Sequence, residues 1–167
     1  MGQMPIDEDR ASDLDLLTHH EAGHAAVAVA MGFRLRAVQI DPHTEDGVTQ
    51  LAEGEQTTRL QQAIILLAEA RAELVLDPSS SMRRLSALAD ECQLLEIIEE
   101  RPSYRLEHLP QNYIDRLCSR MDGQLAACCE RLVRERWSAI QRLAAELARR
   151  PELTGEEAER ALADEDH

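Results

Sequence analysis

Length, composition and charge limit the classes to which this chain can belong. Its 167 residues, 44% of them hydrophobic and 30% charged, are typical of one globular domain. Its 32 acidic residues outnumber 18 basic ones, and the net charge of -14 argues against a nucleic-acid-binding protein, because phosphates require a cationic surface. No apolar run reaches the roughly 18 residues of a membrane span, and the acidic first residues lack the apolar stretch of a secretory signal. We therefore expect a soluble, cytoplasmic protein with no membrane or nucleic-acid partner.

The scarcity of aromatic residues favours a helical fold. Aromatic side chains make up only 2% of the chain, so the core must consist of Ala, Leu, Ile and Val, which suit packed helices better than a β-sandwich. The basic residues are all arginines, which excludes chemistry that needs a lysine, such as a Schiff base or a phosphate-binding P-loop. The four cysteines form no CxxC pair, and we expect free thiols at Cys92, Cys118, Cys128 and Cys129.

The hydrophobic pattern after the first residues predicts a helix and a small β-hairpin. Apolar residues recur at helical spacing from Ser12 or Asp13, either of which is a suitable N-cap, to a stop at Gly32. Residues 34–40 alternate polar and apolar side chains, as a half-buried strand does. Residues 48–52 are the candidate partner strand in a small sheet.

The rest of the chain is predicted to be helical. Thr58 and Gln61 fit a capping box, so we expect a second helix to start there and to end before Pro78. Helices are also predicted in three later segments: Met82 to about Glu100, Gln111 to Arg149 with a bend or break at Gly123, and a short one after Leu153. We interpret residues 1–11 as a disordered acidic tail and residues 12–163 as a single, mainly α domain with a small β-sheet.

A metal-binding motif lies in the first predicted helix. His20, Glu21 and His24 form the pattern H-E-x-x-H, and residues four apart on a helix lie on one face, so both imidazoles can bind one cation. Glu21 is then placed to act as a general base on a water molecule that the cation polarises. Burying these three side chains on an apolar helix without a ligand or polar partners would be costly. The motif therefore predicts a site for Zn²⁺.

The other residues near the motif, and the other histidines, are given different roles. His19 lies about 100° around the helix from His20, so we expect it beside the site or in solvent and not on the ion. We expect another element to pack closely on Gly23, since a glycine inside a helix otherwise costs about 1 kcal/mol. A surface role is expected for the histidines in predicted loops or chain ends: His43, His108 and His167.

A catalytic zinc site needs a third protein ligand, and the spacing of the residues does not decide which one it is. Tetrahedral zinc in such a site has three protein ligands and one open position. No further histidine follows His24 at a suitable spacing, so we expect a carboxylate from farther along the chain. The candidates are Glu69, Glu73, Asp77, Asp90 and Glu91.

The motif and the segments after it resemble those of one family, in the same order. The stretch HEAGHAAVA, which starts at His20, resembles the signature of the FtsH-type zinc peptidases, the protease domain of membrane-bound AAA proteases. Weaker similarities, spread over roughly residues 14–163, are RAVQI with Pro42, GVTQ from Gly47, TR at Thr58 with the helix after it, and LTGEE from Leu153. The resemblance implies a helical peptidase domain with a small sheet, like the FtsH protease domain.

The resemblance also implies roles for particular residues. It assigns the zinc ligands as His20, His24 and Asp90, because the segment ADECQLL lies where the family has an aspartate ligand that opens a helix. A slip of one residue in this comparison would make Glu91 the ligand. Glu21 would be the catalytic base.

Several departures from the family affect the expected function. Glu69 replaces the glycine of the family's LAGRAAEE segment, and the loop before this helix is shorter and more acidic. No P-loop motif occurs, so we expect the protein not to unfold its own substrates by ATP hydrolysis.

These observations predict a soluble zinc metallopeptidase that cleaves peptides or unfolded protein segments. The strand at 34–40 is expected to offer an edge to which an extended substrate adds. The alternative is a metal-binding module with weak proteolytic activity that docks on a partner protein, and the acidic surface would suit a basic partner. The intact Glu21 favours the enzyme, and either function is compatible with a homo-oligomer.

Overall fold

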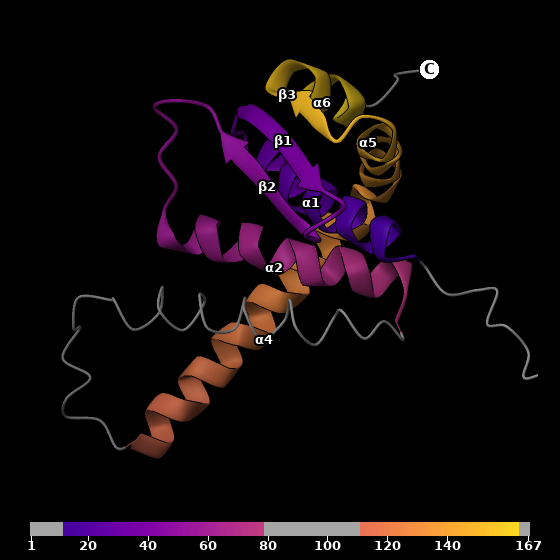
Figure 1. Cartoon of the computed structure of the whole chain (residues 1–167). Helices are drawn as coiled ribbons and strands as arrows, with labels where there is room; N and C mark the ends of the chain where they lie inside the picture. The colour runs from indigo at the N-terminus through magenta and orange to yellow at the C-terminus, as the bar shows by residue number, and fades with distance from the viewer. Residues whose placement is uncertain (1–11, 79–110, 164–167) are drawn as a thin grey trace, which may run out of the picture.

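The computed structural model describes residues 12–78 and 111–163, which form a mainly helical structure with a three-stranded antiparallel sheet (Figure 1). Its elements are α1 (Asp13–Ala30), β1 (Leu35–Asp41), β2 (Asp46–Leu51), α2 (Arg59–Leu76), α4 (Gln111–Glu135), α5 (Trp137–Arg149), β3 (Glu152–Thr154) and α6 (Gly155–Leu162). The predicted tail at 1–11 and the predicted helix from Met82 to Glu100, with Asp90 and Glu91, lie outside the described residues. None of the described helices combines the length and apolarity that a membrane span requires.

Capping boxes begin the two helices that form the candidate site. The hydroxyl of Ser12 accepts a hydrogen bond from the Asp15 amide at 3.1 Å, and the Asp15 carboxylate accepts one from the Ser12 amide at 3.2 Å. Thr58 and Gln61 make the same reciprocal pair at the start of α2. Each cap is worth about 1 kcal/mol. The predicted starts of both helices are therefore confirmed, with Ser12 as the N-cap of α1.

The sheet has the order β2-β1-β3, and its central strand is β1. Val38 of β1 pairs with Thr49 of β2 on one side and with Leu153 of β3 on the other. The expectation that the strand at 34–40 offers a free edge is therefore wrong, because hydrogen bonds on both sides of β1 are used within the sheet. The sequence did not predict β3, whose three residues are too short to show an alternating pattern.

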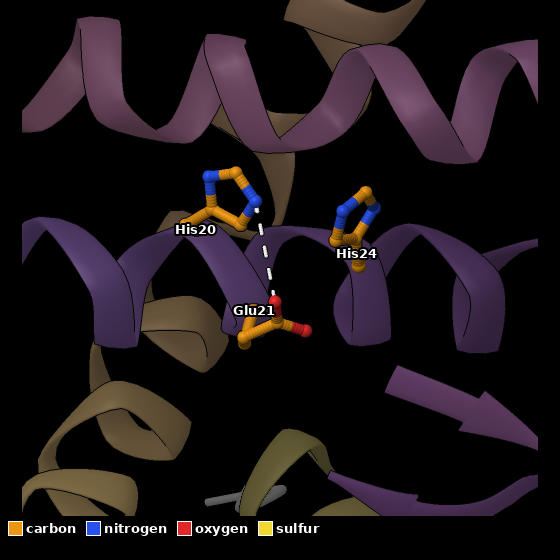
Figure 2. Close-up of side chains that lie close together, drawn as sticks. All are labelled: His20, Glu21 and His24. Carbon is orange, nitrogen blue, oxygen red and sulfur yellow. Dashed lines mark ion pairs between the residues drawn. The ribbon is translucent and has the colours of Figure 1, made fainter. Parts of the chain in front are cut away.

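Helix α1 lies between α2 and the sheet (Figures 1 and 2). Its buried face is built largely from alanines, which allow neighbouring elements to approach closely: Ala22, Ala25, Ala26 and Ala28. The expected close approach at Gly23 is confirmed, since a Cβ there would lie 2.8 Å from the Cβ of Ala72 and 3.0 Å from the carbonyl oxygen of Ala68. Gly23 thus brings α1 and α2 together beside the motif.

The long C-terminal helical segment breaks at Arg136 and not at Gly123. Helix α4 continues through Gly123, where an added Cβ would meet no atom within 4 Å. Arg136 leaves the helical conformation, with φ -103° and ψ 10°, and α5 begins at Trp137. The break lets α5 turn onto α1, where the side chains of Ile140 and Leu143 are fully buried. Tertiary packing, and not local glycine content, decides where this segment bends.

Candidate metal centre

The H-E-x-x-H motif places its three side chains on two sides of α1 (Figure 2). The imidazoles of His20 and His24 point toward α2, with ring centroids 5.3 Å apart and ring planes at 83°. Glu21 points toward the sheet, and its Oε1 lies 4.0 Å from Nε2 of His20. One potential ligand atom from each of the three residues lies within 4.8 Å of the other two. The motif therefore has the clustered geometry that a metal site requires.

A buried carboxylate from α2 joins the two histidines. Oε2 of Glu69 lies 2.6 Å from Nε2 of His20 and also contacts Nε2 of His24. The Glu69 side chain is only 6% exposed. Glu69 was one of the five carboxylates that the spacing left open, and the structure brings it to the two histidines.

The opposite nitrogen of each imidazole is held by a second group. Nδ1 of His20 lies 2.6 Å from Oε1 of Glu73, and Nδ1 of His24 lies 2.8 Å from the carbonyl oxygen of Ile65. A carboxylate or carbonyl oxygen accepts hydrogen bonds, so both Nδ1 atoms donate. These bonds fix the ring orientations and leave both Nε2 atoms facing Glu69, as expected of metal-binding histidines.

The hydrogen-bonded pairs between histidines and carboxylates shift the pKa values at the site. Burial alone would lower the pKa of His20, but hydrogen bonds to the Glu69 and Glu73 carboxylates raise it to about 10. Burial alone would raise the pKa of Glu69, but hydrogen bonds to His20 and His24 hold it at about 2. Glu69 therefore remains an anion near neutral pH, which is the form in which a carboxylate binds a cation.

Strand β2 holds Glu21 from the other side. The hydroxyl of Thr49 donates to Oε2 of Glu21 at 2.9 Å and lies 3.2 Å from the main-chain oxygen of Glu21. Gly47 lies two residues before Thr49, so both face the same side of the strand, against Glu21. This role of Gly47 and Thr49 was not predicted from the stretch GVTQ, although their two-residue spacing is a signal that both residues share one face of a strand.

The remaining predicted residues lie away from the cluster or outside the described part of the chain. His19 is half-buried, its Nδ1 lies 2.7 Å from the main-chain oxygen of Asp15, and its ring centroid is 5.5 Å from that of Trp137. His43 is exposed, as expected. Asp77 is the C-cap residue of α2. The assignment of Asp90, or of Glu91 in its place, as a ligand stays a prediction.

Comparisons of the chain with protein-family models and with curated proteins found no match. The similarity to FtsH-type peptidases thus depends on the motif and on the order of the segments after it. A fold by itself does not define a function, which depends on the geometry and chemistry of a site.

Proposed function

We propose that this protein is a zinc-dependent metallopeptidase with an FtsH-like fold. The observation that carries the proposal is the convergence of the Nε2 atoms of His20 and His24 on one buried carboxylate, with a separate glutamate, Glu21, 4.0 Å from His20. Imidazole nitrogens with a carboxylate oxygen form a donor set that suits Zn²⁺. A bound zinc ion would supply Lewis-acid chemistry, polarising a water molecule and the scissile carbonyl.

Glu21 is the proposed general base. Its Oε2 accepts the hydrogen bond from Thr49, which leaves Oε1 on the side nearer to His20. At Oε1, Glu21 takes a proton from the water that attacks the peptide carbonyl. As the carbon–oxygen bond forms and the carbon–nitrogen bond breaks, Glu21 delivers this proton to the leaving amine. His20 and His24 are held in place for this step by Glu73 and Ile65.

The proposed substrate is an extended peptide that adds to the sheet at β2. Among the described residues, no strand pairs with the outer side of β2, so its free hydrogen-bonding groups are available to a substrate. Gly47 and Thr49 of this strand contact Glu21, so an added peptide would run beside the base. Gly47 also lines a hollow of about 440 Å³ together with the ends of β1 and β3. Peptides and unfolded protein segments are the substrates that fit this arrangement.

The FtsH-like fold is proposed from the order of the elements. The motif helix α1 is followed by the β1–β2 hairpin and then by α2, whose N-cap is Thr58. The segment LTGEE forms the junction of β3 and α6 near the end of the described chain. This order matches the order of the segments that resemble the family.

The test compares the wild-type chain with Glu21→Gln on a library of unstructured peptides. Because general-base catalysis contributes about 10²–10⁴-fold, we expect Glu21→Gln to lower the cleavage rate by at least about 100-fold. The same variant keeps one zinc ion per chain in elemental analysis, because Glu21 is not assigned as a ligand. Glu53→Gln is the matched control, since the Glu53 side chain is 89% exposed and lies outside the site.

Two outcomes would contradict the proposal. Loss of zinc in Glu21→Gln would make Glu21 a ligand and not a base. A wild-type chain that binds zinc but cleaves no peptide would favour the metal-binding module that docks on a partner protein.

A further inference from the structure

We propose that Glu69 is the carboxylate ligand of the ion, so that α1 and α2 together supply all three protein ligands. This inference rests on the zinc site of the proposed function and deepens it. It assigns the carboxylate ligand to position 69, where the FtsH-type family has a glycine. Asp90, which the resemblance implies as the ligand, is then not needed to complete the site.

Hydrogen-bond donors and acceptors do not match at the two histidines and Glu69 without a cation or additional protons. Both Nδ1 atoms face acceptors, namely the Glu73 carboxylate and the Ile65 carbonyl, so each Nδ1 carries a hydrogen. In a neutral imidazole the Nε2 atom is then an acceptor with a lone pair. Both Nε2 atoms nevertheless face the same acceptor, Oε2 of Glu69. Either two additional protons or one cation must lie among these three atoms, and a single divalent cation satisfies all three lone pairs at once.

The burial of the Glu69 carboxylate is costly without a cation beside it. Glu69 is only 6% exposed, and an ionised carboxylate is costly to bury unless it is paired or binds a metal. The described contacts of its Oε2 are the two imidazoles that the sequence identifies as zinc ligands. A buried carboxylate oxygen that faces two imidazole nitrogens matches the donor set of a zinc site.

Close packing of α2 on α1 holds Glu69 rigidly. Glu69 directly follows Ala68, whose carbonyl oxygen lies against Gly23 of the motif helix. Gly23 also meets Ala72, so the two helices are in contact on both sides of Glu69 along α2. The backbone on which Glu69 stands is thereby fixed relative to His20 and His24, and ligands on rigid helices are held more accurately than ligands on loops.

Glu73, one turn after Glu69 on α2, has a different role. It contacts Nδ1 of His20, which is the nitrogen that faces away from Glu69. Glu73 is therefore a positioning residue that orients His20 through the second ring nitrogen, as is common for metal-binding histidines.

The experiment measures zinc affinity by competition with a chelator in the full chain. Glu69→Gln keeps the size of the side chain and removes the ligand charge, and we expect it to weaken zinc binding by more than about 100-fold. Glu73→Gln removes an orienting hydrogen bond, and we expect a loss of about 10–100-fold. Asp90→Asn and Glu91→Gln are expected to keep a zinc affinity within about threefold of wild type. This loss is smaller than the loss expected when an orienting residue is removed.

A second variant separates lost ligation from lost folding. Glu69→His puts a different zinc ligand of similar reach at this position, so it should restore binding to within about tenfold of wild type. Far-UV circular dichroism shows whether each variant is folded. Cobalt substitution adds a readout independent of activity, because the visible absorption of bound Co²⁺ should change in Glu69→Gln and stay unchanged in Asp90→Asn.

The possible results distinguish the inference from the proposed function. Zinc affinity within about tenfold of wild type in Glu69→Gln overturns the inference, because even an orienting residue costs about 10–100-fold. A large loss confined to Asp90→Asn or Glu91→Gln also overturns it and moves the ligand to that residue. If wild type binds zinc and Glu69→Gln does not, but wild type cleaves no peptide, the peptidase proposal fails and the ligand assignment stands. If wild type binds no zinc, both fail.

Discussion

Gly47 lies directly against the carboxylate of Glu21. A Cβ at Gly47 would be 2.5 Å from Oε1 and 2.7 Å from Cδ of Glu21, so no larger residue fits without moving this side chain. Thr49, two residues along β2, donates a hydrogen bond to the other carboxylate oxygen at 2.9 Å. Strand β2 thus fixes the position of the proposed base by a steric limit on one oxygen and a hydrogen bond on the other.

Gly47→Ala should therefore displace Glu21 and lower the cleavage rate. A displacement of about 1 Å can cost about 100-fold in rate, and we expect kcat/KM to fall by about this factor. Zinc affinity should stay within about threefold of wild type, because Gly47 is not proposed to orient a ligand. Loss of a residue that does orient one costs about 10–100-fold. Steady-state kinetics and chelator competition measure the two quantities.

Gly123→Ala is the matched control for this glycine. It lies within α4, and an added Cβ would meet no atom within 4 Å. This variant should keep full activity and gain up to about 1 kcal/mol in the free energy of unfolding, because alanine favours a helix over glycine. Equal activity losses in Gly47→Ala and Gly123→Ala would show that the effect does not arise from contact with Glu21.

Thr49→Val should lower activity by removing the donor to Glu21 while keeping the shape of the side chain. A hydrogen bond to a charged group contributes about 1.5–3 kcal/mol, so we expect a loss of about 10–100-fold in kcat/KM with zinc affinity unchanged. Thr49→Ser restores the hydroxyl and should recover most of the rate. Failure of Thr49→Ser to recover more activity than Thr49→Val would mean that the Thr49 methyl group matters and the hydroxyl does not.

The elements that the sequence predicted well are those set by local interactions. Ser12 and Thr58 begin helices through hydrogen bonds to residues only three positions away, so their roles are visible in a short stretch of sequence. His20 and His24 share a face because of helix geometry alone. The β1–β2 hairpin was likewise predicted from its alternating side chains and the turn between its strands.

The features that the sequence did not predict depend on tertiary packing. The position of β1 in the middle of the sheet depends on Leu153, more than 100 residues later in the chain. The helix break at Arg136 depends on how α5 packs onto α1. The choice among the candidate carboxylates depends on how α1 lies on α2. A close approach at Gly23 could be predicted, but no local pattern identifies Ala72 of α2 as its partner.

Gly23→Ala tests this helix contact. The added Cβ would lie 2.8 Å from the Cβ of Ala72, so α1 and α2 must separate. Overpacking costs about 1–3 kcal/mol, and the helix preference of alanine returns about 1 kcal/mol, so the net loss of stability should be about 1 kcal/mol. Zinc affinity should fall by about tenfold or more, as for loss of an orienting residue, because Glu69 moves relative to His24.

A compensating variant makes the Gly23 prediction specific. Gly23→Ala with Ala72→Gly transfers the methyl group from α2 to α1 and should recover most of the lost zinc affinity. Chemical denaturation and chelator competition on both single variants and on the double variant give the coupling between the two positions. Additive losses in the double variant would contradict a contact between these two side chains.

Cys129 should resist alkylation in the folded protein. Its side chain is buried between α4 and α2, and its sulfur lies 3.5 Å from the carbonyl oxygen of Ile64. Burial raises the pKa of this thiol to about 12. Only the thiolate reacts with iodoacetamide, so Cys129 should react far more slowly than the half-buried Cys128 at pH 9.

The direction of the pH effect follows from the same shift. The pKa of a cysteine in the unfolded chain is about 8.5, so between about pH 9 and 12 the unfolded chain carries a thiolate at Cys129 where the folded chain carries a thiol. The contribution of this protonated thiol to stability is complete below about pH 8.5 and is lost as the pH rises toward 12.

Tandem mass spectrometry after short exposure to iodoacetamide, with and without urea, distinguishes the two adjacent cysteines. Equal modification of Cys128 and Cys129 is expected only in urea, because unfolding exposes both thiols. Equal modification without urea would contradict the packing of α4 on α2.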